Sequence, residues 1–451
     1  MLKFISVFCL LYLQLHSATL HPDSNNNSLI VYNSNVGLVH ESRDLKLKKE
    51  DVQIIYEDVA SSINTDSVNV SLPKGISLFS QQYRYDKLTQ NKLLDAHIGE
   101  KVSVNLLKDA KNFKTIRATL LSNDGSSCII THQNQISIVE SKNIIFDTIP
   151  KELITKPSLV WNIQTNKKIH SQMSIDYLIN HITWKSNYIL QLDGERANLS
   201  GWITIDNRSG KAFQNTALHV LAGEINRAAQ ARQNYRVAKS MAMVQADSPE
   251  IAHQAHEGYH FYTIPFKVNL ANNEKTQIKF ITQDNIDIKR NYKVKMNHPN
   301  YFSGEIKHDV IQTITIKALE LPIPEGIVRT YSSLANTNIL LGESHIKHTP
   351  KDTPVSLKLG KNFDVKVKET LILRDRGSWY HDNDVRYSVK NSSDETKTIE
   401  ISVPFTNNDS DEITSKEKYT FTKGNLVTFK VKVQANSTKK FDVHYRSKVQ
   451  K

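Results

Sequence analysis

Cysteine is almost absent from the chain, with two residues in 451, Cys9 and Cys128. Cys9 lies in an apolar run at the N-terminus that we expect to be removed with a signal peptide. One remaining thiol cannot form an internal disulfide, so the stability of the mature chain must come from core packing. Cys128 leads into a predicted strand, which favours a buried, inert thiol over a nucleophile.

Long hydrophobic runs are missing as well. No segment after the N-terminus approaches the roughly 18 apolar residues of a membrane-spanning helix, so we expect no transmembrane segment in the mature chain. The N-terminal run, Phe4 to Leu15, is itself too short. Together with a basic start and small residues up to Ala18, it is typical of a secretory signal peptide over residues 1–18. We therefore expect an exported protein, periplasmic or secreted; an uncleaved signal acting as an anchor is the alternative.

The apolar content is low, at 39%. This fits β domains with one solvated sheet face better than a doubly wound α/β enzyme with continuous hydrophobic strands. The formal net charge is +12, with Lys and Arg spread along the chain as expected for polar strand faces and protected edges. Contact with an anionic surface is the functional alternative. No helix-turn-helix, paired Cys/His finger or aromatic strand beside a basic run indicates a nucleic-acid partner, so none is expected.

Catalytic and cofactor motifs are absent. The sequence contains no G-x-S-x-G elbow, H-E-x-x-H helix, phosphate loop or G-x-G-x-x-G turn. We therefore predict a non-enzymatic protein without a cofactor. The competing hypothesis is a glycan-processing hydrolase acting in the periplasm or outside the cell, which would need a pair of carboxylates in one cleft.

What the sequence does contain is apolar alternation with period two, which indicates half-buried strands. From Ile182 to Leu192 most alternate residues are large or apolar, and Asp193-Gly194 then turns the chain. Two further runs follow, Leu199 to Asn207 and Ala217 to Ala222. This stretch predicts the packed centre of an antiparallel β domain.

The predicted fold class is mainly β, an antiparallel multi-domain β-sandwich architecture. Five short strands joined by tight turns indicate a small SH3-like or Sm-like barrel module. Regular alternation near the C-terminus is typical of an immunoglobulin-like or fibronectin-like sandwich. After the signal peptide, the predicted divisions are an N-terminal β region (19–98), the barrel (99–149), a central β-sandwich (150–319) and the C-terminal sandwich (320–451).

One segment departs from the β pattern. Residues 228–257 are rich in Ala, Gln and Arg, which are good helix formers, and Ser248-Pro249 divides them. We predict an excursion from the central sandwich, either two short helices or a partly disordered loop. Long insertions of this kind inside compact domains are often functional.

Several segments of the chain match a known family in their order and spacing. Four of them are LIVYNSNVGLVHESRDL (29–45), YRYDKLTQNKLLDAHIGEKV (83–102), SGWITIDNRSGKAFQNTALHVLAGEINR (200–227) and LPIPEGIVRTY (321–331). With them the chain resembles the bacterial family called domain of unknown function 4139, a domain also found at the C-terminal end of mucoidy inhibitor A-like proteins. The resemblance covers nearly the whole mature chain. The family has no assigned biochemical role, so the resemblance supplies no catalytic or ligand residues.

Three histidines, His253, His256 and His260, are the candidate metal ligands. A helix over residues 250–257 would put His253 and His256 on one face. Two ligands fall short of the three or four that zinc sites use. We therefore expect the polar face of an exposed helix and no bound metal.

A second candidate site lies between two predicted strands, where Trp379, Tyr380, His381, Asp382 and Asp384 are concentrated. We expect an exposed loop tip. Its functional alternatives are a contact loop for carbohydrate or calcium, or an acid/base pair if the groups were held in a cleft. The protein as a whole is predicted to be a binding or scaffolding module with an envelope protein or a glycan as partner. Self-association through exposed edge strands or the excursion is a third possibility.

Overall fold

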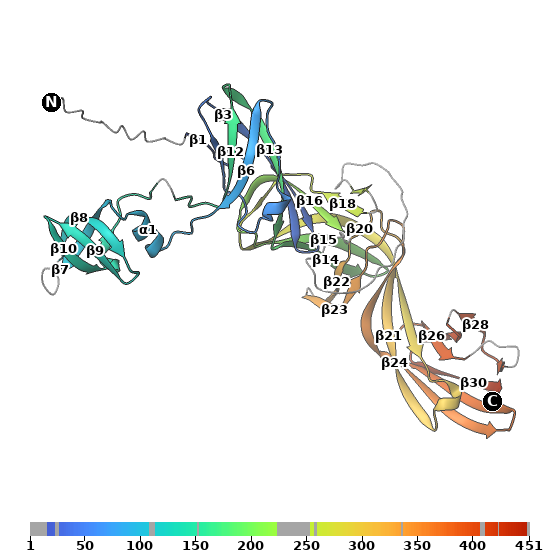
Figure 1. Cartoon of the computed structure of the whole chain (residues 1–451). Coiled ribbons are helices and arrows are strands. Elements are labelled where there is room, and N and C mark those ends of the chain that lie inside the picture. The colour runs from blue at the N-terminus through green and yellow to red at the C-terminus, as the bar shows by residue number, and fades with distance from the viewer. Residues whose placement is uncertain are drawn as a thin grey trace, which may run out of the picture. The chain divides into compact units, whose positions relative to one another are not determined.

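The computed structural model describes residues 16–22, 27–107, 113–150, 153–222, 253–256, 259–334, 337–405, 411–422 and 424–448 (Figure 1). These residues form thirty β-strands and one α-helix, α1 (Gln90–Ala96). Most strand pairs are antiparallel, which confirms the predicted mainly β, multi-sheet fold. Within this part of the chain, no helix combines the length and the apolar composition that crossing a membrane requires.

The chain divides into two compact units that are interleaved in sequence. The first unit comprises the residues up to Trp184 and Ile205–Thr276, and the second comprises Lys185–Thr204 and the residues from Gln277 onward. The segment 185–204 therefore leaves the first unit and returns to it.

A four-stranded sheet of the first unit has the order β1-β4-β12-β6. Its strands are β1 (Ser17–Leu20), β4 (Gln53–Glu57), β12 (Ser158–Thr165) and β6 (Ile76–Arg84). Alternation determines the inward face, because Ile54 and Tyr56 of β4 are buried while their neighbours are partly exposed. The signal-peptide cut predicted after Ala18 falls inside β1, which pairs in parallel with β4.

An eight-stranded sheet of the same unit has the order β17-β18-β16-β2-β3-β13-β5, with β19 paired to β16. The strands are β2 (Asn27–Tyr32), β3 (Val36–Leu47), β5 (Asn69–Ser71), β13 (Ile169–Asn180), β16 (Phe213–Ala222), β17 (His253–His256), β18 (Tyr259–Thr263) and β19 (Val268–Leu270). Between β3 and β13 twelve consecutive residue pairs face each other without a bulge.

Most of the excursion predicted for residues 228–257 lies outside the described residues. Its described part, residues 253–256, is the strand β17, which pairs antiparallel with β18. The helix predicted there is therefore wrong. Hydrogen bonding to the neighbouring strand overrides the weak helix preference of a short His-Gln-Ala-His segment.

A separate five-stranded sheet, which we call the small sheet, has the order β10-β9-β8-β7-β11. Its strands are β7 (Lys101–Leu107), β8 (Phe113–Asn123), β9 (Ser127–His132), β10 (Gln135–Glu140) and β11 (Ile144–Ile145). The five strands were predicted, but the barrel is not closed, since no pairing among the described residues joins β10 to β11. Cys128 is buried in the core on one face of this sheet, as predicted.

The largest sheet has thirteen strands, with β23-β22-β14-β15-β20-β21-β24-β25-β30-β27 in order and β26, β28 and β29 attached. Its strands are β14 (Ile182–Asp193), β15 (Arg196–Asn207), β20 (Glu274–Lys295), β21 (Glu305–Ile316), β22 (Gly326–Leu334), β23 (Thr337–Ile346), β24 (Val355–Arg376), β25 (Tyr380–Asn391), β26 (Lys397–Pro404), β27 (Glu412–Ser415), β28 (Tyr419–Thr422), β29 (Leu426–Val433) and β30 (Ser437–Lys448).

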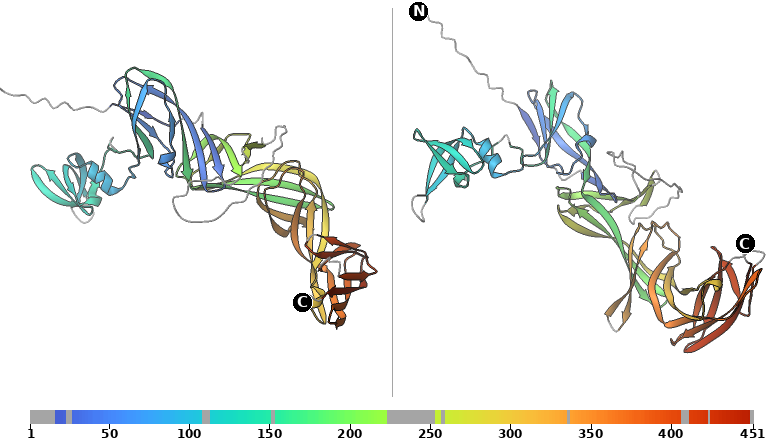
Figure 2. Two further views of the ribbon diagram at one scale, coloured as in Figure 1. Left: turned by 45° about the vertical axis from the view of Figure 1, so that its right-hand side comes forward. Right: turned by 60° about the horizontal axis from the view of Figure 1, so that its bottom comes forward.

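Two of these strands are unusually long. β20 and β24 run through the second unit as long ribbons (Figures 1 and 2) and have 22 residues each. Both supply side chains to two separate hydrophobic clusters. In the C-terminal cluster, the ring of Phe429 in β29 lies 6.2 Å from Tyr387 in β25 and 5.4 Å from Phe441 in β30, measured between centroids. Strands β26, β29 and β28 thus cover β25 and β30, which gives a sandwich.

Candidate functional site

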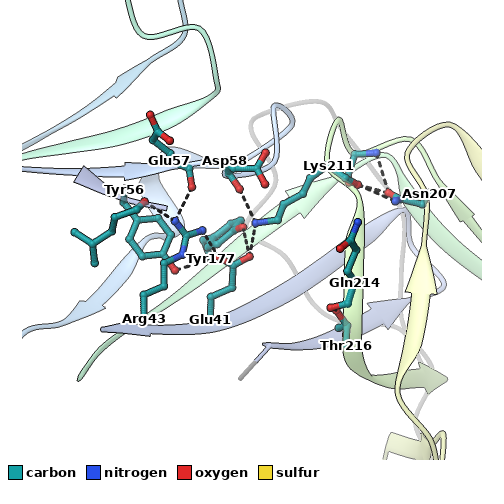
Figure 3. Close-up of polar contacts among 12 residues, drawn as sticks. Glu41, Arg43, Tyr56, Glu57, Asp58, Tyr177, Asn207, Lys211, Gln214 and Thr216 are labelled. Carbon is teal, nitrogen blue, oxygen red and sulfur yellow. Dashed lines mark hydrogen bonds and ion pairs between the residues drawn. The ribbon is translucent and has the colours of Figure 1, made fainter. Parts of the chain in front are cut away.

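The first unit holds a group of ionised side chains in its core, which we call the buried ionic cluster: Glu41, Arg43, Tyr56, Tyr177 and Lys211 (Figure 3). Glu41 and Arg43 come from β3, and both occupy the inward-facing register of that strand. Tyr56 comes from β4 in the four-stranded sheet and Tyr177 from β13 in the eight-stranded sheet. The cluster therefore lies where these two sheets face each other.

Arg43 binds one carboxylate and two backbone carbonyls. Its Nη2 lies 2.8 Å from Glu41 Oε2, and its Nη1 donates to the carbonyl oxygens of Leu20 at 3.0 Å and Glu57 at 2.6 Å. The guanidinium carbon also lies 3.5 Å from the centre of the Tyr56 ring, a cation–π contact. Arg43 thereby connects β3 to the edge strand β1 and to the end of β4.

Lys211 reaches the cluster from a turn between β15 and β16. Its Nζ donates to Glu41 Oε1 and to the carbonyl oxygen of Asp58, both at 2.5 Å. The turn is held by Asn207, whose Nδ2 donates to the Lys211 carbonyl at 2.9 Å (Figure 3). Gly210 completes the turn at φ +83°, where an added Cβ would lie 1.7 Å from Ser61 Oγ.

The electrostatics of the cluster favour an ionised Glu41. Burial raises the pKa of Glu41, but the positive charges of Lys211 and Arg43 and their hydrogen bonds together lower it below its ordinary value. Burial, with the nearby Glu41 charge, raises the pKa of Tyr56, so the phenol stays neutral. Its hydroxyl donates a hydrogen bond to Glu41 Oε2 at 3.0 Å. Tyr177 donates to Oε1 at 3.3 Å.

This arrangement leaves Glu41 no capacity for acid/base chemistry. Its two oxygens accept from four donors, which fills the lone-pair positions of a carboxylate. The side chain is also almost wholly removed from solvent, at 2% exposure. What the cluster does is structural: it fixes the Asn207–Lys211 turn against β3 and β4. Sequence reasoning missed it, although two charged residues in the apolar register of a strand are a signal for such a cluster.

The second candidate site lies where β24 turns into β25. Five large apolar side chains are exposed at this end of the sandwich and form what we call the aromatic end: Tyr301 at 84%, Ile372 at 48%, Leu373 at 57%, Trp379 at 63% and Tyr380 at 39%. Trp379 occupies the turn after β24, and Tyr380 opens β25. The β24–β25 register shifts between Leu371 and Leu373, a bulge of the kind that redirects side chains next to functional sites.

The predicted contact residues are mostly on a strand. Tyr380, His381, Asp382 and Asp384 belong to β25, and only Trp379 is in a turn, so the predicted loop tip is wrong in that respect. The reason is that β25 pairs with β30 from Tyr380 to Asn391 on one side and with β24 from His381 to Asn391 on the other.

The two aspartates share one face of β25 and are both engaged. Asp382 binds Arg446 through Nε at 2.8 Å and Nη2 at 3.3 Å. His444 lies between the aspartates, with Nδ1 2.8 Å from Asp384 and Nε2 3.3 Å from Asp382. The hydrogen bonds from Arg446 lower the pKa of Asp382, so this carboxyl is ionised at neutral pH and is no general acid. Arg446 in turn lies over the Tyr380 ring, at 5.5 Å.

Tyr301 is positioned by a short 3-10 helix, η3 (Pro299–Tyr301), that is bound to the same end of the sandwich. Asn300 accepts from Asn383 at 2.7 Å and donates to Ser447 at 3.0 Å. Arg374 donates to the carbonyl oxygen of Pro299 at 2.7 Å. Sequence reasoning missed Tyr301, because nothing local relates it to a strand about 80 residues later.

The helix on which the weak metal candidates rested is replaced by strands, β17 for His253 and His256 and β18 for His260. His253 and His256 lie three residues apart in the strand β17, so the helical spacing argument no longer applies. His260 lies in β18, opposite Ala255. Among the described residues, no group of three or more His, Cys, Asp or Glu side chains is arranged to hold a metal ion.

No protein-family model matches the chain, and no curated protein matches it. The resemblance to the domain of unknown function 4139 family therefore stays a prediction based on the segments quoted above.

Proposed function

We propose that the protein is an exported, non-enzymatic binding module of the cell envelope or the secreted fraction, and that the aromatic end is its contact surface. The observation that carries this proposal is the exposure of five large apolar side chains at one end of a sandwich. Exposed apolar groups that gather in one place mark interaction sites, whereas single exposed residues do not.

The scaffold under the aromatic end supports a binding role. η3 is tied to β25 and β30 through Asn300, and Arg374 binds the backbone of η3 from β24. Side chains on a hydrogen-bonded scaffold lose little conformational entropy when a partner binds, so more of the contact energy remains as affinity.

The composition favours a protein as partner. Trp, Tyr and Arg dominate the residues that contribute most to protein–protein binding, and here Trp379, Tyr380 and Arg446 occur together. Leu373 adds an aliphatic side chain, which contributes through burial against an apolar group of a partner. We therefore favour an envelope protein over a glycan.

The test is affinity capture with the full chain as bait, using envelope and extracellular fractions and quantitative mass spectrometry. Trp379→Ala combined with Tyr301→Ala is compared with Phe363→Ala, which removes an aromatic side chain of 83% exposure near the middle of β24. We expect one partner to be lost with the double variant and retained with the control. Equal recovery in all three would refute the surface, and loss of a polysaccharide in place of a protein would make the partner a glycan.

Export is tested separately, by N-terminal sequencing of the protein from cell fractions. We expect the exported form to begin at Thr19. A chain found only inside the cell with Met1 intact would contradict the exported location without affecting the contact surface.

A further inference from the structure

Strand β10 is an edge of the small sheet, and its outer side carries no partner strand among the described residues. It pairs with β9 without a bulge from Gln135 to Glu140. Ile136 and Ile138 project from the same face of β10, and both are strongly exposed, at 71% and 73%. Ile129 of β9 lies opposite Ile138 and extends the same apolar face.

The other sheet edges of the described chain are protected against pairing, and β10 is not. The edge strands β1, β5, β11, β17, β27 and β28 have four residues or fewer. The longer edge strands β6 and β23 carry a shift in register. Short and bulged edges are the usual means of preventing edge-to-edge association. β10 has six residues, pairs with β9 without a shift in register, and contains no Lys or Pro.

We propose that β10 pairs antiparallel with β10 of a second copy of this chain, about a two-fold axis through Ser137. In this register Ile136 lies opposite Ile138 of the partner subunit, and both point to the same face, as directly opposed residues in antiparallel strands do. The two small sheets then join into one continuous ten-stranded sheet. This inference uses a different surface from the proposed binding site and does not depend on it.

The sequence of β10 fits a copy of itself. The order Ile-Ser-Ile is symmetric about Ser137, so one pairing satisfies both strands equally. Glu140 lies opposite Asn134 of the partner subunit, so no like charges face each other along the strand. The module around it (residues 99–149) carries six Lys and Arg against five Asp and Glu, a net charge of +1, although the whole chain carries +12. A second copy is therefore not repelled at this sheet.

The size of the contact sets the expected affinity. Six residues of backbone pairing and a few exposed aliphatic side chains per copy place it among small interfaces, so we expect a dimer with a Kd of roughly micromolar order. Sedimentation velocity of the full chain over about 1 to 100 μM should then show a concentration-dependent shift from monomer to dimer.

Two variants test the strand. Ile138→Lys places a charge on the paired face and should weaken association at least tenfold, while Ile145→Lys, on the opposite edge strand β11, should leave it unchanged. Circular dichroism confirms that both are folded. A native chain that stays monomeric throughout the series, or a dimer that survives Ile138→Lys, would overturn the proposal.

Cross-linking tests the register. With Cys9 replaced by Ser and Cys128 retained because it is buried, a Ser137→Cys chain should be linked to itself by a bismaleimide of about 8 Å. A Gln135→Cys chain should not, because the two introduced thiols would be four residues apart along the strands, about 13 Å. Equal linking of both variants would refute pairing about Ser137, and no linking of either would refute the pairing itself.

Discussion

The buried ionic cluster makes a quantitative prediction for Glu41→Gln. The substitution keeps the size of the side chain and removes the only negative charge of the cluster. Arg43 and Lys211 then remain buried, at 2% and 6% exposure, without a counter-ion. Removing one member of a buried ion pair costs about 3–5 kcal/mol, because the remaining charge is left uncompensated. With two cations left behind, we expect about 4 kcal/mol.

The neighbouring substitution Lys211→Met should cost less. Glu41 keeps Arg43, at 2.8 Å, and both tyrosine hydroxyls, so only one charged hydrogen-bonding partner is lost. Hydrogen bonds to charged groups contribute about 1.5–3 kcal/mol, so we expect about 2 kcal/mol. The order of the two variants is thus a sharper test than either value alone.

The assay must report the stability of the first unit by itself, because a chain with two interleaved units need not unfold in one step. Hydrogen–deuterium exchange by mass spectrometry does so in peptides that cover β3 and the Asn207–Lys211 turn. A loss of about 4 kcal/mol corresponds to exchange that is roughly a thousandfold faster.

The matched control is Glu343→Gln, which breaks an exposed pair with Arg329 in the other unit and should change exchange there by less than about 1 kcal/mol. Less than tenfold acceleration for Glu41→Gln, or a larger effect for Lys211→Met, would refute the reasoning.

Three further predictions follow from individual groups. The folded-state pKa of Glu41 is lowered from an ordinary value of 4.5, so its contribution to stability is complete above about pH 4.5 and is lost as the pH falls through the folded pKa. Thermal melts from pH 7 to 3 should show this decline in stability, and the Glu41→Gln variant should lack it. Gly210→Ala should destabilise by about 2 kcal/mol in urea unfolding, because Gly210 combines positive φ with the close Ser61 hydroxyl, and Gly424→Ala, with a similar φ and open space, should cost less. Asp382→Asn loses a partly exposed ion pair and should lower stability by less than about 1 kcal/mol in thermal melts; a loss above 3 kcal/mol would contradict its surface role.

The strands themselves were predictable, because alternation is a local property of the sequence. The run from Ile182 to Leu192 is β14, which ends one residue later at Asp193. The run from Leu199 to Asn207 is contained in β15, which begins at Arg196. Burial of Cys128 followed from the same pattern. Each of these inferences needs only the residues on either side.

The buried ionic cluster was not predictable, because its partners are far apart in sequence. Lys211 and Glu41 are separated by 170 residues and meet only through the arrangement of the sheets. Glu41 and Arg43 are two residues apart, as residues on one strand face are, but nothing local to them shows that this face is buried. Tyr301 at the aromatic end is a similar case, since its position depends on Asn300 bonding to Asn383.

The errors also have a physical origin. The helix predicted around His253 and His256 rested on propensity, which is weaker than the hydrogen bonds of an adjacent strand. The barrel predicted from five short strands is open, because β10 and β11 lie at opposite edges of the sheet and no pairing among the described residues joins them. The loop predicted for Tyr380 to Asp384 is a strand, because β25 is flanked by partner strands on both sides, and only Trp379 remains in a turn.

The sequence positions of the buried ionic cluster also fix an order of events during synthesis. A chain emerging from the ribosome carries Glu41 and Arg43 early, yet their partner Lys211 follows 170 residues after Glu41. At typical rates of about 5–20 residues per second, this interval lasts roughly 10–30 seconds. Throughout it the first unit lacks its last cation, the turn that carries it and the strand β16 that pairs with β2. The unit is thus completed late, and until then its N-terminal strands remain open to chaperones.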